Sequence, residues 1–210
     1  MLDIAEELSR WVEEARSFAV ATFVAASGSG PGAPCAALAV DAEGTVIGSL
    51  PDGCVDGAIH ELCHKVMFSG EPVVERFDCS DEIDTLVTPI LAGTPLGAVF
   101  RSALLATARG EPAVLARVVR GPADKLGTTL LVRPDCSYEG GLGGPPELDQ
   151  AAAAEAHALL EAGRSGTLDL SASAARWESP RTESAGGSLS PGSLTLLVES
   201  NASPPRMIVL

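Results

Sequence analysis

The chain has 210 residues, enough for one large domain or two small ones with a buried core. Hydrophobic residues make up 46% of it, which excludes a disordered protein, and aromatic residues only 4%, so Ala, Val and Leu must build the core. The net charge is −14 and the 14 Lys and Arg residues form no cluster, which argues against nucleic acid or a membrane surface as a partner.

The first part of the chain alternates helical and strand patterns around a Gly/Pro-rich loop at 28–34. The predicted elements are a helix over Leu2–Arg16, a strand over Phe18–Ala26, a hairpin of Ala36–Val40 and Thr45–Leu50, a helix over Cys54–Phe68, and strands over Val73–Phe77 and Thr85–Ile90.

The later chain repeats this order. The predicted elements are a helix over Gly97–Arg109, strands over Ala113–Val119 and Thr128–Arg133, a short strand over Ser137–Gly140, a helix over Pro146–Glu161, and strands over Thr167–Leu170 and Ser193–Glu199. The stretch Trp177–Gly192 is rich in Ser, Gly and Pro without periodicity, which predicts a flexible surface loop.

The repeat extends to individual residues. Val40, Gly48 and Leu50 each have an identical residue 92 positions later: Val132, Gly140 and Leu142. We therefore predict an α+β fold, an internally duplicated unit of mixed β-sheet with packed helices, in one domain over 1–203 with halves at about 1–96 and 97–203. A chance likeness of two α+β hairpins is the alternative.

The end of the sequence has a different character. Pro204-Pro205 is typical of a linker, and the apolar run 206–210 that follows predicts either a strand at the edge of this sheet or the start of a second domain. No segment is long and apolar enough to cross a bilayer, and no signal peptide is recognisable at the start.

The five cysteines are scattered and include no Cys-x-x-Cys pair, which indicates free thiols in a reducing compartment. We expect a cytoplasmic protein. Cys54 is the candidate with a chemical role, because it follows Gly53 at the first turn of a predicted helix. Free backbone amides and the helix dipole there lower a thiol's pKa, and the glycine lets the backbone approach a ligand closely. A small buried residue at a helix start is the alternative, and the other cysteines favour such ordinary buried positions.

Two further motifs are similar to known functional patterns. His60-Glu61-Leu62-Cys63-His64 matches the zinc-peptidase pattern, but Val55, Ile59, Leu62 and Val66 define the buried side of this helix, so His60 and His64 are expected towards solvent. His157 is the only other histidine, and nothing in the sequence brings it near. The loop Gly28-Ser29-Gly30-Pro31-Gly32 is followed by Pro34 and a strand pattern instead of a helix, so it is no dinucleotide fingerprint. A plain connecting loop is favoured, and a binding loop for another anion is the alternative.

Taken together, several stretches resemble the N-terminal domain of the XdhC/CoxI family, in the family's order and over essentially the whole chain. They are MLDIAEELSRWVEEARSFAVAT, the loop 28–34, ALAVDAEGTVIGS, DGCVDGA with ELC, ERFDCSDE, LVTPI, LVRPDCSYEGGLG with PELD, LLVES and PPRMIV.

The resemblance implies a non-catalytic accessory protein that binds molybdenum cofactor, protects it and hands it to a xanthine dehydrogenase-type apoenzyme. A soft thiolate suits molybdenum and Gly-rich loops suit a pterin phosphate, so the implied cofactor residues are Cys54, Gly53, Gly28, Ser29, Gly30 and Gly32. The implied protein partners are the apoenzyme, a cysteine desulfurase and a second copy of the chain.

Four departures from the family pattern leave a second interpretation open. Gly32 and Ala33 follow Pro31 where the family typically has Arg, and the turn at Asp52 lacks one Gly. A Gly-rich segment with a second Cys is missing, since Asp81-Glu82 runs straight into the next strand, and the family usually continues past PPRMIV into a Rossmann-like domain. The alternative is therefore a degenerate or truncated member that acts only as a protein-interaction module.

Overall fold

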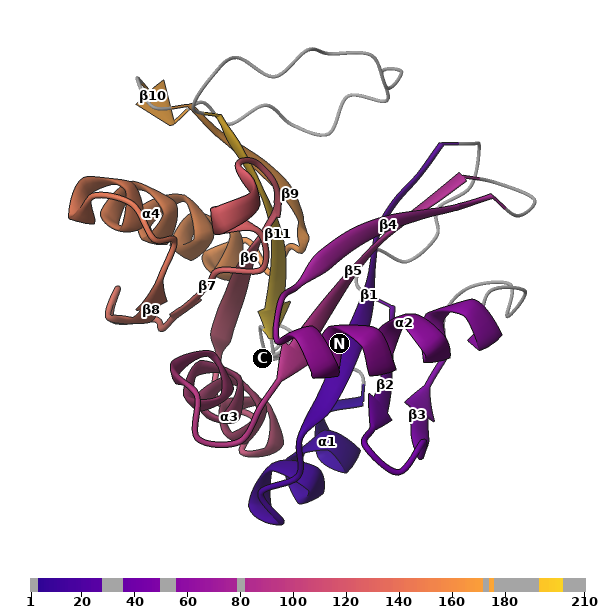
Figure 1. The fold of residues 1–210 in the computed structure, drawn as a ribbon. Helices are drawn as coiled ribbons and strands as arrows, with labels where there is room; N and C mark the ends of the chain where they lie inside the picture. Colours follow the sequence, from indigo (N-terminus) through magenta and orange to yellow (C-terminus); the bar gives the residue numbers. More distant parts are fainter. Residues whose placement is uncertain are drawn as a thin grey trace, which may run out of the picture.

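The computed structural model describes residues 4–27, 36–49, 56–78, 82–171, 174–175 and 193–201. They form an α+β fold with two separate sheets (Figure 1). The first sheet has the strand order β3-β2-β1-β5-β4 and the second the order β10-β9-β11-β6-β7-β8. The expected α+β class is confirmed, but the mixed sheet is corrected, because every pairing of described strands is antiparallel.

The predicted elements are found in the predicted order, with ends that differ by a few residues. The first half contains α1 Ala5–Glu13, β1 Phe18–Ser27, β2 Ala37–Asp41, β3 Val46–Gly48, α2 Asp56–Ser69, β4 Val73–Asp78 and β5 Glu82–Ile90. The second half contains α3 Pro95–Ala108, β6 Ala113–Arg120, the 3-10 turn η2 Ala123–Lys125, β7 Thr129–Val132, β8 Tyr138–Gly141, α4 Pro146–Glu161, β9 Gly166–Ser171, β10 Ala174–Ala175 and β11 Leu194–Asn201. The loop 177–192 and the end 204–210 lie outside the described residues.

The internal duplication is visible in the topology. Each half runs helix, three antiparallel strands, helix and two long strands, between which the second half has the additional two-residue strand β10, and the last strand of each half pairs with the first. Gly48 and Gly140 occupy equivalent places, with φ of 80° and 90°. A Cβ at Gly48 would overlap the carbonyl oxygen of Ala37, and one at Gly140 that of Thr129, so both strands need glycine there. Leu50 lies outside the described residues.

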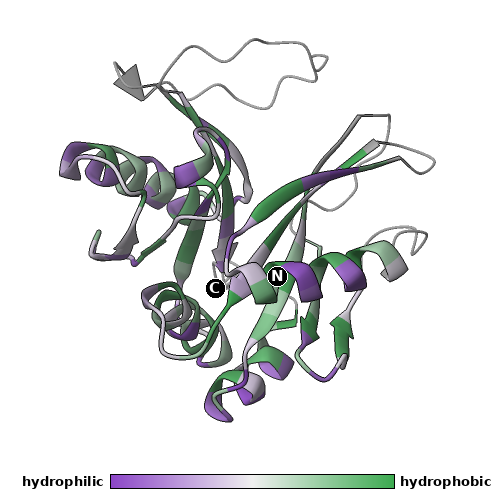
Figure 2. Ribbon diagram, in the orientation of Figure 1, coloured by the Kyte–Doolittle hydropathy of each residue, from purple (hydrophilic) through white to green (hydrophobic). Residues whose placement is uncertain are grey.

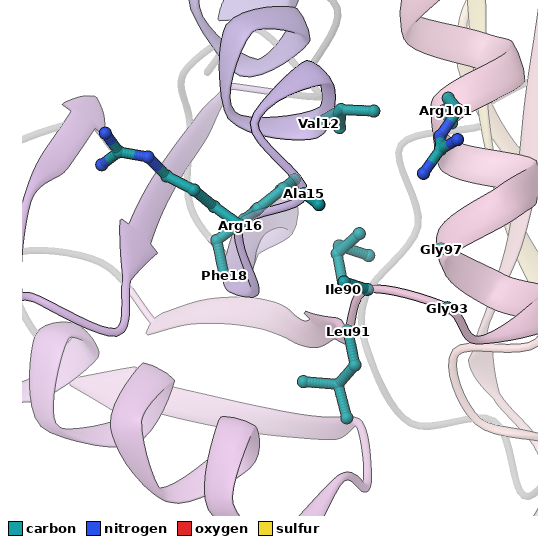
Figure 3. A pocket seen from close by; sticks show the side chains of 10 residues that line it. Val12, Ala15, Arg16, Phe18, Ile90, Leu91, Gly93, Gly97 and Arg101 are labelled. Atoms are coloured by element: carbon teal, nitrogen blue, oxygen red, sulfur yellow. The ribbon is translucent and has the colours of Figure 1, made fainter.

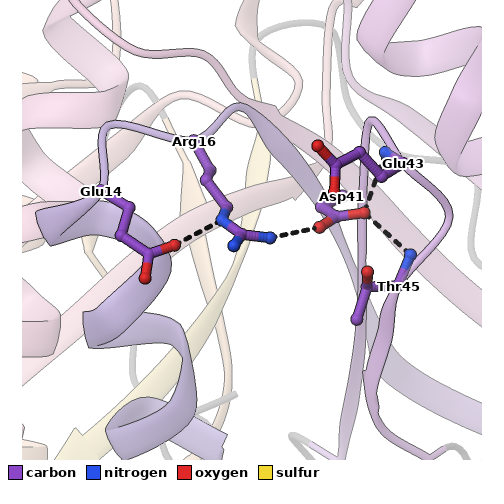
Figure 4. A network of polar contacts seen from close by, with 5 residues as sticks. All are labelled: Glu14, Arg16, Asp41, Glu43 and Thr45. Carbon is purple, nitrogen blue, oxygen red and sulfur yellow. Dashed lines mark hydrogen bonds and ion pairs between the residues drawn. The ribbon is translucent and has the colours of Figure 1, made fainter.

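A polar network closes the β2–β3 turn (Figure 4). The Asp41 carboxylate accepts the backbone N–H of Glu43 at 2.9 Å and that of Thr45 at 2.8 Å, and the Arg16 guanidinium donates to its other oxygen at 3.0 Å. Burial would raise the pKa of Asp41, but the hydrogen bonds from Thr45, Arg16 and Glu43 outweigh burial and lower it. In the second half Asp135 accepts the N–H of Ser137 at 3.0 Å in the same way.

The helices and sheets form layers. Helix α2 packs on the outer face of the first sheet and α4 on the outer face of the second, while α1 and α3 fill the space between the two sheets at one end (Figure 1). The strands are mostly hydrophobic, and each helix carries both hydrophobic and hydrophilic residues, which agrees with burial of one face (Figure 2). One cluster joins Phe18 and Val20 of the first sheet, Phe100 of α3, and Leu115 and Leu131 of the second sheet, so the halves share a core. None of the helices in the described ranges is long and apolar enough to span a membrane.

Charged side chains also lie between the sheets. Arg117 of β6 is fully buried, donates to the hydroxyl of Thr22 in β1 at 3.0 Å and forms an ion pair with Glu199 of β11. Its guanidinium carbon lies 5.8 Å from the centre of the Phe100 ring. Burial would raise the pKa of Glu199, but the positive charge of Arg117 counteracts burial and the pKa is lowered. The ion pair lies within the second sheet, and the hydrogen bond from Arg117 to Thr22 ties that sheet to the first.

Candidate functional site

The residues expected to hold a cofactor belong to two connecting segments of the first half. Gly28, Ser29, Gly30, Gly32, Gly53 and Cys54 all lie outside the described residues, and so does Val55. The structure does describe the strand ends that adjoin these segments. It therefore shows where in the fold the two segments attach.

Those strand ends share one end of the first sheet, which we call the loop edge and define by Ser27, Gly48, Asp56, Asp78 and Glu82. Ser27 at the end of β1 is paired with Glu82 at the start of β5, and Asp78 at the end of β4 is paired with the same residue. Strand β3 ends beside the start of β2, where Gly48 is paired with Leu38. Helix α2 begins at Asp56, after the segment that follows β3. The described strand ends next to these segments thus point to the same end of the first sheet, and β1 extends six residues beyond the level of Gly48.

The connection from β4 to β5 is short. The two strands are paired up to Asp78 and Glu82, so only residues 79–81 join them. This agrees with the shortened connection expected from the sequence, and it leaves no length for an additional Gly-rich segment with a second Cys.

An ion cluster joins the two sheets next to the loop edge. Asp84 of β5 accepts hydrogen bonds from Arg76 of β4, at 2.7 and 3.2 Å, and from Arg120 of β6 at 2.9 Å. Burial would raise the pKa of Asp84, but the hydrogen bonds and charges of both guanidinium groups outweigh burial and lower it. The carboxylate is therefore ionised and structural, and it fixes the distance between the sheets at this end.

Helix α2 supports the loop edge from the outer face. Ile59, Cys63 and Val66 are its buried side chains, whereas Leu62 is only half-buried, so the expected buried stripe is corrected by one position. Burial raises the pKa of Cys63 to about 12, which keeps its thiol protonated. Cys63 is thus a core residue, as the sequence indicated.

The histidines on α2 form a contacting pair. The ring centres of His60 and His64 are 4.7 Å apart and both side chains are half-buried, which corrects the expected solvent-facing position. His157 of α4 instead contacts the carbonyl oxygen of Pro134 at 3.0 Å. Within the described ranges no three His, Cys, Asp or Glu side chains come together to hold a metal, so the zinc-peptidase hypothesis gains no support.

The hairpin turn of the second half exposes a cysteine. Cys136 is exposed and has φ of 64°, which corrects the buried position expected for it. Cys35 and Cys79 lie outside the described residues.

The second half has its own counterpart of the Gly53-Cys54 segment, between β8 and α4. There the N–H of Leu142 donates to the Asp149 carboxylate at 2.8 Å, and the Lys125 ammonium donates to the carbonyl oxygen of Gly143. Two backbone groups of this turn, the N–H of Leu142 and the carbonyl of Gly143, are thus bonded to side chains of the protein itself.

A small pocket lies at the opposite end of the first sheet, where α1 ends and α3 begins (Figure 3). Val12, Phe18 and Ile90 line it, Arg101 stands on the α3 side, and Arg16 extends away from it towards Asp41. Its volume of about 20 Å³ suffices for a water molecule but not for an organic cofactor.

A larger cavity was not expected from the sequence. The inter-half groove, as we call it, has a volume of about 500 Å³ and is formed by Pro72 before β4, Leu96 and Val99 of α3, Leu126 after η2, Thr129 of β7, and Gly140 of β8. Its walls come from separate parts of the chain, so no local motif could reveal it.

Comparisons with known proteins agree with this fold. The sequence profile of the XdhC and CoxI family matches residues 11–78 and 106–171. Among solved structures, one described as a xanthine dehydrogenase from Bacillus halodurans aligns with 69% of this chain and 47% of its own, at 16% identity and a TM-score of 0.57. The chain thus spans about half the length of that protein, and the likeness concerns the fold alone. No curated protein matches.

The two matched segments correspond to each other in the duplicated fold. The first ends with β4 and the second with β9, its counterpart, and each begins in the helix that precedes a three-stranded unit. The match therefore covers both halves of the fold and more than half of the sequence, and the chain belongs to the XdhC and CoxI family.

Proposed function

We propose that this chain is a non-catalytic accessory protein that binds molybdenum cofactor and delivers it to a xanthine dehydrogenase-type apoenzyme in the cytoplasm. Family membership supports the maturation role. The observation that carries the cofactor proposal is the loop edge, since β2, which follows 28–35, begins beside the end of β3, which precedes 50–55. Residues from both segments can therefore reach one ligand.

The chemistry of the two segments suits this ligand. Cys54 offers a soft thiolate for molybdenum, and Gly53 allows close approach of the backbone. Gly28, Ser29, Gly30 and Gly32 offer backbone amides to the pterin phosphate. In this role the protein partners are the apoenzyme and a cysteine desulfurase, and the chain forms a homodimer.

The test is cofactor retention by protein produced in cells that make molybdenum cofactor. We expect the purified wild-type chain to retain molybdenum and pterin in equal amounts, measured by mass spectrometry of the metal and fluorescence of the oxidised pterin. Cys54→Ser should lose most of both, because a hydroxyl is a poor ligand for a soft metal. Cys136→Ser, which changes an exposed thiol on a distant hairpin, is the matched control.

Equal retention by Cys54→Ser and the control would remove Cys54 from the site. The alternative function, an interaction module without cofactor, is favoured by the short connection 79–81. It predicts that the wild-type chain holds no molybdenum and still co-purifies with the apoenzyme.

A further inference from the structure

The open edge of the second sheet carries unpaired backbone groups. Strand β8 is the last strand of that sheet, so only one of its sides is paired. The N–H of Arg133 donates to the carbonyl oxygen of Ser137 at 2.9 Å, which makes 133 and 137 a hydrogen-bonded pair. Hydrogen-bonded and non-hydrogen-bonded pairs alternate along antiparallel strands. The backbone groups of Glu139 and Gly141 therefore point at β7, while those of Tyr138 and Gly140 point outward.

Both outward residues are accessible. Gly140 is exposed, and Tyr138 is one of the few exposed large hydrophobic side chains in the described ranges, at 36%. Val46, at 47%, has the equivalent position on β3, the open edge of the first sheet. The apolar side chain next to an unpaired backbone is thus repeated in both halves.

The inter-half groove lies next to β8, whose Gly140 and Gly141 form part of its wall. The groove is bounded by Gly140 on one side and by Leu96, Val99 and Leu126 on others, and no charged side chain lines it. Its volume of about 500 Å³ holds one or two large apolar side chains. An open strand beside an apolar pocket is the arrangement that proteins use to bind an extended peptide.

The charges beside the groove indicate the peptide's composition. Glu147 and Asp149 lie in the first turn of α4, and the Asp149 carboxylate lies next to Gly141. Asp124 forms an ion pair with Lys125, whose ammonium donates to the carbonyl oxygen of Gly143. Three acidic groups thus face one basic group at this end, in a chain of net charge −14. At the other end of β8, Arg133 and Glu139 neutralise each other.

The geometry points to a peptide-binding site at β8: an extended segment of a partner protein adds to the open edge as a further strand, places an apolar side chain in the inter-half groove and a basic residue near the start of α4. This site is separate from the loop edge and does not depend on cofactor binding.

The test uses a fluorescein-labelled synthetic peptide in which Thr and Val alternate around a central Leu, with Lys at both ends. Its control is the same peptide with alternate backbone nitrogens methylated, which leaves the side chains and removes the hydrogen-bond donors on one edge. We expect fluorescence polarisation to show binding of the first peptide and at least about tenfold weaker binding of the second. In the ¹⁵N spectrum the amides of Tyr138 and Gly140 should shift.

Two variants locate the site on the protein. Tyr138→Pro removes one outward N–H, and Val46→Pro at the equivalent position of β3 is its control. Leu126→Trp fills the groove from a half-buried position and leaves the strand intact. Both Tyr138→Pro and Leu126→Trp should weaken binding about tenfold, while Val46→Pro should not.

Three results would overturn the proposal. Equal binding of both peptides would mean that the groove takes an apolar group, such as a small molecule, without strand addition. Amide shifts confined to β3 would move the site to the other edge. Absence of binding by both peptides to the wild-type chain would remove it.

Discussion

The turn of the second hairpin has a cysteine at the position where the first hairpin has a glycine. Gly44 and Cys136 are 92 positions apart and have φ of 86° and 64°. In equivalent turns, their N–H groups donate to the backbone carbonyl oxygens of Asp41 and Arg133. Only glycine adopts this left-handed conformation without strain. The second half therefore carries a strained residue where the first half has the unstrained one.

Replacing Cys136 by glycine should stabilise the protein. We expect Cys136→Gly to raise the free energy of unfolding by about 0.5–1 kcal/mol, because the release of left-handed strain exceeds the entropy that glycine adds to the unfolded chain. Chemical denaturation monitored by circular dichroism measures the change. Cys136→Ala keeps the strain and serves as control, and equal stability of the two variants would show that the turn is unstrained.

At the scale of elements, α3 joins the two halves. Its N-terminus is fixed by Thr94, whose hydroxyl accepts the N–H of Gly97 at 3.1 Å, and by Pro95 in the first turn. Phe100 and Leu104 are fully buried in the core that both sheets share. The helix that begins the second half is thus also part of the first half's core.

Truncation of the central side chain of α3 should destabilise both halves at once. We expect Phe100→Ala to lower the free energy of unfolding by about 3–5 kcal/mol, since it leaves a cavity between the sheets. Arg101→Ala, at the next and exposed position, should change it by less than about 0.5 kcal/mol. Unfolding in two separate steps would contradict a shared core.

The elements themselves were largely predictable from the sequence. Glycines and prolines such as Gly70, Gly110 and Pro146 mark ends that periodicity alone leaves open, and α4 has the predicted bounds. The sequence indicated a buried Cys63 on α2, but it did not predict that the neighbouring Leu62 is only half-buried, because both residues fit the helical period and only contact with the sheet distinguishes them. Division into two sheets depends on pairing between distant strands, which no local pattern encodes. The candidate site residues remain predictions, whereas the inter-half groove required the assembled fold.

At the scale of the whole molecule, the two sheets are connected by ionised groups as well as by the core. Asp84 of the first sheet forms an ion pair with Arg120 of the second sheet, and Arg76 of β4 forms an ion pair with the same carboxylate. Its pKa is lower in the folded protein than the ordinary 3.8, because both guanidinium groups favour the charged form over the effect of burial. The stability that the ionised Asp84 contributes is complete above the pKa of Asp84 in the unfolded chain. It is lost as the pH falls through the pKa of Asp84 in the folded protein.

Acid should therefore weaken the connection between the sheets. We expect wild-type stability to fall as the pH drops below about 4, and Asp84→Asn to show a smaller fall, since the variant has no proton to bind at this position. At pH 7 the variant should be less stable by about 1–2 kcal/mol. Urea denaturation at a series of pH values measures both effects, and parallel pH profiles of the two proteins would contradict the assignment to Asp84.

The closed turn between β8 and α4 has a consequence for stoichiometry. In the second half, the N–H of Leu142 donates to Asp149 and the carbonyl oxygen of Gly143 accepts from Lys125. These two backbone groups are therefore bonded to side chains of the protein and are not available to a ligand. The fold is duplicated, but the binding position that we propose for it is not. One chain should therefore bind one cofactor. If a sample bound more than one equivalent, the excess would have to be bound elsewhere than at the turn between β8 and α4.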